Sequence, residues 1–174
     1  VALAGAASPA FAQCSANDGV VQCSGNPGPI AYQQGYPSLT VQNLTAFITQ
    51  PTYPLSGVLL SFTAGNGGQN QQGGGGLGLT LSFAGAPYGV TSQGGGLSVL
   101  STAGNGGLGK EEDNGGAGGA GGNVVLQFTG GTVTTTPAEG GAGLWAQSTG
   151  GDGGASSFLH KFFFNGHGGN GGAG

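Results

Sequence analysis

The sequence predicts an all-β protein, specifically a right-handed parallel β-helix or β-solenoid with long glycine-rich loops. Three observations support this prediction. A twelve-residue motif occurs three times, and self-similarity at intervals of about 20–50 residues is typical of repeat architectures. Short apolar runs alternate with polar residues, as expected of strands with one buried face. These runs are bounded by Gly and Asn, and none has helix caps or the 3.6-residue period of a helix.

The motif is GVLLSFTAGNGG at 57–68, GLSVLSTAGNGG at 96–107 and GLWAQSTGGDGG at 143–154. The copies align without a gap and start 39 (96 − 57) and 47 (143 − 96) residues apart. Each opens on Gly, has Thr at the seventh place and ends in Gly-Asx-Gly-Gly. The defining positions are Gly57, Thr63, Asn66, Gly96, Thr102, Asn105, Gly143, Thr149 and Asp152. One copy cannot bury its apolar face alone, so we expect copies to stack with parallel, in-register strands.

The composition limits the classes of partner. Glycine supplies 44 of 174 residues, whereas charged residues number only 8, two of them basic. Soluble domains average about 7% Gly and about 25% charged residues. Nucleic acids and anionic membranes are bound by Lys and Arg clusters, so this chain is expected to bind neither. Its apolar runs are far shorter than the roughly 20 residues that span a bilayer, so we expect no membrane insertion by this segment.

The first twelve residues resemble the end of a secretory signal peptide. The stretch VALAGAASPAFA is apolar and small, and Ala10-Phe11-Ala12 has the A-x-A form of a cleavage site. A short buried apolar segment is the alternative. We expect cleavage between Ala12 and Gln13, and export to the cell surface or the extracellular space.

Residues 13–56 are predicted to form an N-terminal cap stapled by one disulfide. Cys14 and Cys23 are an even pair directly after an export signal, which favours a structural bridge in an oxidising compartment. The bridge closes a hairpin with a turn around 17–19. Partial alternation in 38–49 predicts one or two short strands, and the surrounding Pro residues suit the edge of a stack.

A second type of strand is predicted between the motif copies. Residues 77–83, LGLTLSF, alternate strictly, and VVLQF at 124–128 is their counterpart, 45 residues later (124 − 79). The β-branched stretch 132–136 is a candidate third strand. Phe158 and the Phe residues of 162–164 are expected to form another strand. Residues 57–174 are thus expected to be glycine-rich β repeats that stop within a repeat.

The glycine-rich stretches have three interpretations. They are disordered protrusions, polyproline-II segments that pack on one another, or tight turns in which Gly supplies positive φ. The repeat length varies and the third strand of a coil is poorly marked. A layered β-sandwich with glycine-rich polyproline-II flaps is therefore the alternative fold.

No catalytic, cofactor or metal site is predicted. His160 and His167 lack further ligands at fixed offsets, and no phosphate-binding or nucleophile-elbow motif occurs. We expect the charged run 110–113 to be a solvated loop tip rather than a Ca²⁺ site. The acidic residues all lie in predicted turns and loops: Asp18, Glu111, Glu112, Asp113, Glu139 and Asp152. A glycosidase needs two acids converging on a cleft, so an enzyme is not expected.

The third copy, GLWAQSTGGDGG, with GGAGGAGGN and GGNGGAG near it, resembles a motif of glycine-rich bacterial autotransporter passengers (type V secretion). The resemblance covers about 57–174 and the signal remnant, and the AQS core matches fully in one copy. It implies secretion through a C-terminal outer-membrane β-barrel, which these residues do not include, and display as an elongated β-helix. The glycine-rich runs are also similar to surface domains of mycobacteria, our second choice.

These expectations lead to a non-catalytic cell-surface or secreted module with a structural or adhesive role. Its partner is either an unknown surface ligand or another copy of itself. A self-assembling extracellular matrix filament is the first alternative, because low charge and exposed strand ends favour association. A polysaccharide-acting β-helix enzyme is the less favoured alternative.

Overall fold

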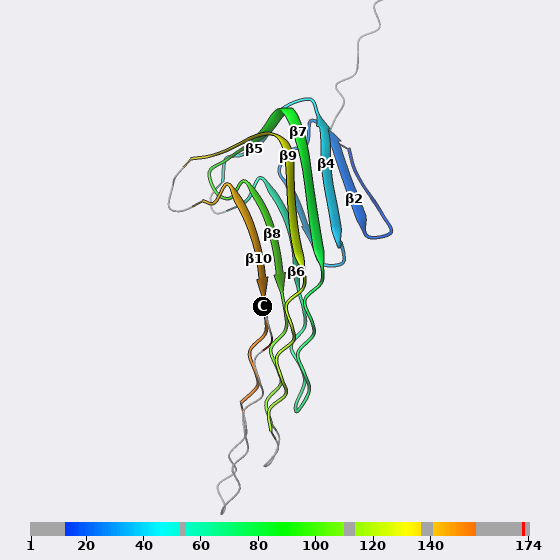
Figure 1. The fold of residues 1–174 in the computed structure, drawn as a ribbon, viewed down its shortest axis with the longest axis vertical. Coiled ribbons are helices and arrows are strands. Elements are labelled where there is room, and N and C mark those ends of the chain that lie inside the picture. The colour runs from blue at the N-terminus through cyan, green and yellow to red at the C-terminus, as the bar shows by residue number, and fades with distance from the viewer. Residues whose placement is uncertain (1–12, 53–54, 110–113, 137–140, 156–171, 173–174) are drawn as a thin grey trace, which may run out of the picture.

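A computed structural model describes residues 13–52, 55–109, 114–136, 141–155 and 172. In this part of the chain every regular element is a strand, so the all-β prediction is confirmed (Figure 1). The strands are β1 (Gln13–Asn17), β2 (Val20–Gly25), β3 (Ile30–Gln33), β4 (Ser38–Leu44), β5 (Ile48–Gln50), β6 (Val58–Thr63), β7 (Leu79–Ser92), β8 (Leu97–Thr102), β9 (Val124–Thr135) and β10 (Leu144–Thr149).

The strands form two sheets. The first has six strands in the order β1-β2-β4-β7-β5, with β9 also paired to β7, and the second has the order β10-β8-β6-β3. All described pairs are parallel except β1 with β2. The chain visits the first sheet and then the second four times in succession (β1–β2 then β3, β4–β5 then β6, β7 then β8, β9 then β10). Equivalent strands of successive passes therefore lie side by side.

The pairing follows the repeat register predicted from the sequence. Val58 pairs with Leu97, and Leu97 pairs with Leu144, so the three motif copies align position by position. In the other sheet, Leu79 pairs with Val124, the predicted offset of 45 residues. The prediction of parallel, in-register stacking of like strands is confirmed. It follows from the period-two alternation that the strands share, because a slip by one residue would turn the buried face to solvent.

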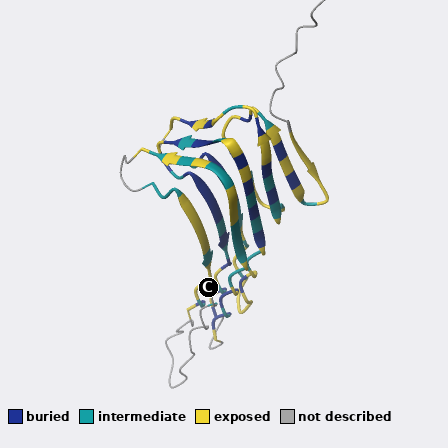
Figure 2. Ribbon diagram, turned by 45° about the horizontal axis from the view of Figure 1, so that its top comes forward, coloured by how far each residue is buried: buried dark blue, intermediate teal, exposed yellow. Residues whose placement is uncertain are grey.

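The core lies between the sheets and is built by alternation. In β4, Leu39 and Val41 are fully buried whereas Thr40 between them is half-buried, and Figure 2 shows the same banding on neighbouring strands. Each such aliphatic side chain contributes about 1.5–3 kcal/mol by leaving water. The largest fully buried side chains are Phe83, Leu39, Ile48, Leu60, Leu79, Leu81, Leu97, Val21, Val41, Val58, Val90 and Val99.

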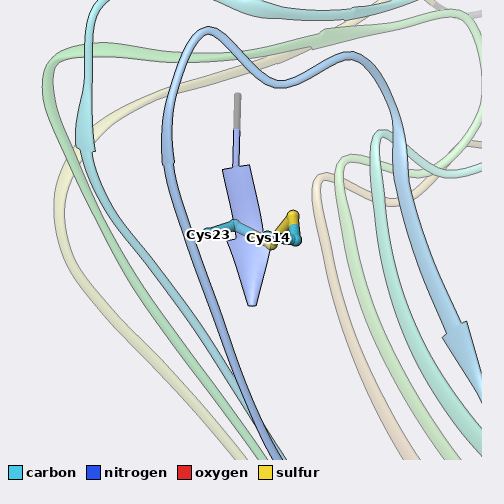
Figure 3. The surroundings of a disulfide bond; sticks show 2 residues. All are labelled: Cys14 and Cys23. Atoms are coloured by element: carbon cyan, nitrogen blue, oxygen red, sulfur yellow. A yellow bond between two sulfur atoms is a disulfide. The ribbon is translucent and has the colours of Figure 1, made fainter. Parts of the chain in front are cut away.

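The N-terminal part forms the predicted stapled hairpin. Asp18 and Gly19 have positive φ (47° and 79°) in the turn that joins β1 to β2. Cys14 lies directly opposite Cys23, and the two form the predicted disulfide (Figure 3). Cys23 is buried in the core whereas Cys14 is exposed. β1 is thus an antiparallel strand that covers the outer edge of β2, where a further parallel strand would otherwise pair.

Some elements differ from the expectation. Residues 132–136 do not begin a separate strand, because β9 continues from Val124 to Thr135 and its second half pairs with the second half of β7. β3, which follows Pro29, was not predicted; it extends the second sheet beside β6. Predicted features at Ala12, 110–113, Glu139, Phe158, His160, 162–164 and His167 lie outside the described residues.

Candidate functional site: the glycine-rich bundle

The glycine-rich stretches form legs that extend beyond the ends of the second sheet. Outgoing legs follow β6, β8 and β10 at 64–70, 103–109 and 150–155, and returning legs run at 71–78 and 114–123. Figure 1 shows them side by side, projecting away from the sheets. None has strand or helix hydrogen bonding within itself.

Neighbouring outgoing legs bond to one another at every third residue. The N–H of Gly67 donates to the carbonyl of Asn105 (2.8 Å), and the N–H of Gly106 donates to the carbonyl of Asp152 (2.8 Å). The bonds of this series are Ala64 to Thr102, Gly67 to Asn105, Asn70 to Leu108, Ala103 to Thr149, Gly106 to Asp152 and Gly109 to Ala155. Three residues per turn, with no bonds inside the segment, is the geometry of a polyproline-II helix.

The returning legs form a second layer bonded to the first. Gly104 donates to Gly74 at 2.9 Å, and Gly119 of the next returning leg donates to Gly104 at 2.9 Å. The other interlayer bonds are Gly74 to Gly65, Gly107 to Gln71, Gly116 to Gly107, Gly151 to Gly119 and Gly154 to Gly116. The legs are therefore a two-layer bundle in which each helix is held by its neighbours.

Close approach explains why glycine dominates the legs. A Cβ at Gly107 would overlap the carbonyl oxygen of Gly68, and one at Gly116 would overlap that of Gln71. Side chains occur where the leg faces solvent, again at every third position: Asn105, Leu108, Asn114, Ala117, Ala120 and Asn123 are exposed or half-buried. Of the three interpretations of the glycine-rich sequence, packed polyproline-II segments describe these legs, not disorder or tight turns.

The Asn of the motif links one copy to the next. The side-chain Oδ1 of Asn66 accepts a hydrogen bond from the N–H of Asn105 (2.9 Å), and the Oδ1 of Asn105 accepts one from the N–H of Asp152 (2.9 Å). The N–H groups that donate to these side-chain oxygens lie at the exposed face and take no part in the backbone bonding of the bundle. An oxygen on a short side chain is required here, which explains the Asn or Asp at this place.

The Thr and first Gly of the motif also stack. Thr63, Thr102 and Thr149 are direct neighbours across three strands. At the opening Gly, a Cβ on Gly57 would overlap Cγ1 of Val90, and one on Gly96 would overlap Cγ1 of Val133. The nine predicted motif positions thus come together as three ladders, one of Gly, one of Thr and one of Asx.

The surface formed by the described residues carries little charge. Among the residues described, Asp18 and Asp152 are the ones with ionic side chains, one in the β1–β2 turn and the other on a leg. No group of three or more His, Cys, Asp or Glu residues that could hold a metal ion is found within the described ranges. No helix there has the length and apolar character needed to cross a membrane.

No family model, curated protein or solved structure matches this chain. Its ladders and its bundle are thus the features that bear on function.

Proposed function

We propose that the chain is a non-catalytic structural and adhesive module, exported and held at the cell surface or outside the cell. In this proposal the two sheets are faces of a right-handed β-solenoid, as in autotransporter passengers, and each pass of the chain through both sheets is one coil. The glycine-rich bundle is the part that projects. The observation that supports it best is the continuity of hydrogen bonding between repeats, from the strands into the legs.

This continuity suits a mechanical role. Repeat proteins gain stability from interfaces between neighbouring repeats, and here each leg adds backbone bonds to those of the strands. Backbone bonding that runs through both the strands and the legs of the described repeats maintains their shape with few charges and a small core. The Cys14–Cys23 disulfide fits an oxidising, extracellular location.

The experiment that tests location uses cells that produce the protein. Antibodies against the folded chain are expected to label intact cells or to detect the protein in the medium. Labelling that appears only after the cells are permeabilised, with no protein in the medium, would contradict the proposal.

Adhesion is tested with matched variants on one leg. Gly107→Val places a side chain inside the bundle, whereas Leu108→Val changes a residue that is 64% exposed. Cells displaying Gly107→Val are expected to adhere less to one another or to a solid surface than those displaying Leu108→Val, at equal surface abundance. Equal adhesion of the two variants would show that the bundle does not contribute to adhesion.

A self-assembling matrix filament is the second candidate. Its support is the edge formed by β9 and β10, where Leu144, Trp145 and Phe128 are exposed at 50%, 47% and 37%. Such an edge favours association. Filaments seen by electron microscopy of the purified chain would favour this candidate over an adhesive module that stays monomeric.

A further inference from the structure

The third copy of the motif presents an open edge. Within the described chain, β10 pairs with β8 alone and β9 with β7 alone. Leu144 is 50% exposed, although its partner Leu97, at the same place in the second copy, is fully buried. The side chains of Leu144 and Ala146, which stand in register with the buried Leu97 and Val99, are thus exposed at this edge.

A buried hydroxyl group lacks a partner there. In the second copy, Oγ of Ser101 donates to the carbonyl of Leu77 at 2.7 Å. Ser148 is the register partner of Ser101, but its Oγ is buried without a hydrogen bond to any described residue. A buried hydroxyl without a partner is costly, so this group marks a place where the packing of the third copy is incomplete.

Ser148 also lines a cavity of about 470 Å³ that is open to solvent at this edge. Its lining is Gly121, Gly122, Asn123, Val124, Ala146 and Ser148. Ala146 stands where the second copy has Val99, and Gly122 lies 45 residues after Leu77, the offset that relates the two passes. The pass through β9 and β10 therefore has smaller side chains where the pass through β7 and β8 fills its core.

The leg at 150–155, which lies beside this edge, has backbone N–H groups in position to bond to one more leg. Ala103 and Gly106 donate outward to the third copy. The groups at their places in the third copy are the N–H of Gly150 and of Gly153, and neither donates to a described residue. Asp152 carries a side-chain oxygen at the place where Asn66 and Asn105 accept from the next leg.

We propose that this edge binds, by parallel strand addition, a polypeptide segment that carries the repeat's own pattern. The segment pairs with β10, inserts a large apolar side chain into the cavity beside Ser148, and continues as a Gly-Asx-Gly-Gly leg along 150–155. The argument is continuity, since the same ladder already joins the first copy to the second and the second to the third. Strand addition is a general mode of peptide recognition, with main-chain bonds giving affinity and pockets giving specificity.

The first copy of the motif has the features this site requires. It carries Phe62 at the position that aligns with Ser101 and Ser148, followed by the Thr and the Asn of the ladders. The synthetic peptide SGVLLSFTAGNGGQN, the sequence of 56–70, is therefore the probe. The proposal concerns an edge of the sheets, so it stands or falls independently of where the protein is located.

Trp145 reports binding directly. It is the sole Trp of the chain and lies on β10, 47% exposed. Titrating the peptide into the full chain is expected to shift the Trp145 emission to shorter wavelength, saturably and with one peptide per chain. No shift, or a shift that does not saturate, would overturn the proposal.

Two peptide variants test the mode of binding without altering the protein. Proline at the positions of Leu59 and Ser61 removes backbone donors and is expected to abolish the shift. Ala at the position of Phe62 leaves the cavity empty and is expected to weaken binding at least about tenfold, since burying a Phe is worth more than about 1.4 kcal/mol. Equal binding of the proline peptide would overturn strand addition, and equal binding of the Ala peptide would overturn insertion into the cavity.

A variant of the protein tests the cavity from the other side. Ala146→Leu fills part of the cavity. It is expected to weaken binding of the peptide with Phe at position 62 more than binding of the peptide with Ala there. Leu108→Ser, on an outgoing leg away from the cavity, is the control and is expected to bind as the unaltered chain does. Equal losses for both peptides would show that Ala146 does not contact the inserted ring, which also counts against the proposal.

Discussion

The side chain of Asn66 accepts a hydrogen bond from the backbone N–H of Asn105, which lies 39 residues later in the chain, at 2.9 Å. The same relation joins Asn105 to Asp152 across 47 residues. The same side-chain contact thus recurs between repeats whose lengths differ. The extra residues of the longer repeat are taken up elsewhere, so the ladder keeps its register.

Asn105→Ala is expected to destabilise the protein by about 0.5–1.5 kcal/mol, because an N–H of the exposed face loses its acceptor. Asn105→Asp keeps an oxygen at the same place and is expected to change the free energy of unfolding by less than Ala does. Denaturant unfolding of the purified variants measures both. Leu108→Ala, on the same leg but exposed to solvent, is the control. An Asp variant as unstable as the Ala variant would show that the ladder does not depend on the acceptor.

Gly107→Ala and Gly65→Ala are a matched pair for the bundle. A Cβ at Gly107 would overlap the carbonyl oxygen of Gly68, whereas no atom lies within 4 Å of one at Gly65. We expect Gly107→Ala to cost about 1–3 kcal/mol and Gly65→Ala to be neutral or slightly stabilising. Hydrogen exchange of the leg amides is expected to increase in the first variant alone. Equal effects at the two positions would contradict close packing of the legs.

Gly57 and Val90 are expected to be energetically coupled, because a Cβ at Gly57 would overlap Cγ1 of Val90. Gly57→Ala destabilises by about 1–3 kcal/mol through overpacking, and Val90→Ala destabilises by leaving a gap. The double variant is expected to be more stable than the sum of the two predicts, by about 0.5–3 kcal/mol. A double-mutant cycle from urea unfolding measures this coupling. Strict additivity would mean that the two residues do not meet.

Reduction of the Cys14–Cys23 disulfide is expected to free β1 while leaving the parallel sheet in place. β1 pairs with β2 alone, whereas β2 also pairs with β4 and contributes Val21 and Cys23 to the core. Reduction is expected to lower the free energy of unfolding by about 2–3 kcal/mol, as for bridges that close short loops. Hydrogen exchange with and without reductant tests this. The amides of β1 should lose protection and those of β4 should keep it, and loss of protection throughout β4 would contradict the proposed local role.

Several features followed from the sequence alone. The period-two alternation at 77–83 and 124–128 placed two strands and their 45-residue offset, because the strand signal is local and its register is fixed by which residues must be buried. Cys14 and Cys23 were predicted to pair because no other cysteine is present. By contrast, β3 escaped prediction, since the few residues after a Pro give too short a pattern.

The glycine-rich legs depended on tertiary structure. Polyproline-II helices have no internal hydrogen bonds, so GNGG at 65–68 or GGAGGAGG at 115–122 has no local signal that separates packed helices from disorder. Their order comes from bonds between different legs, such as those from Gly67 to Asn105 and from Gly151 to Gly119. No single leg contains both partners of such a bond.

The sequence by itself therefore determined that the chain is all-β and that like strands pair in register. The reason is that the alternation of apolar and polar residues along each strand fixes which side chains must be buried. Only the tertiary structure decided that the glycine-rich residues form a two-layer bundle, because the hydrogen bonds that hold each leg need a partner from another leg.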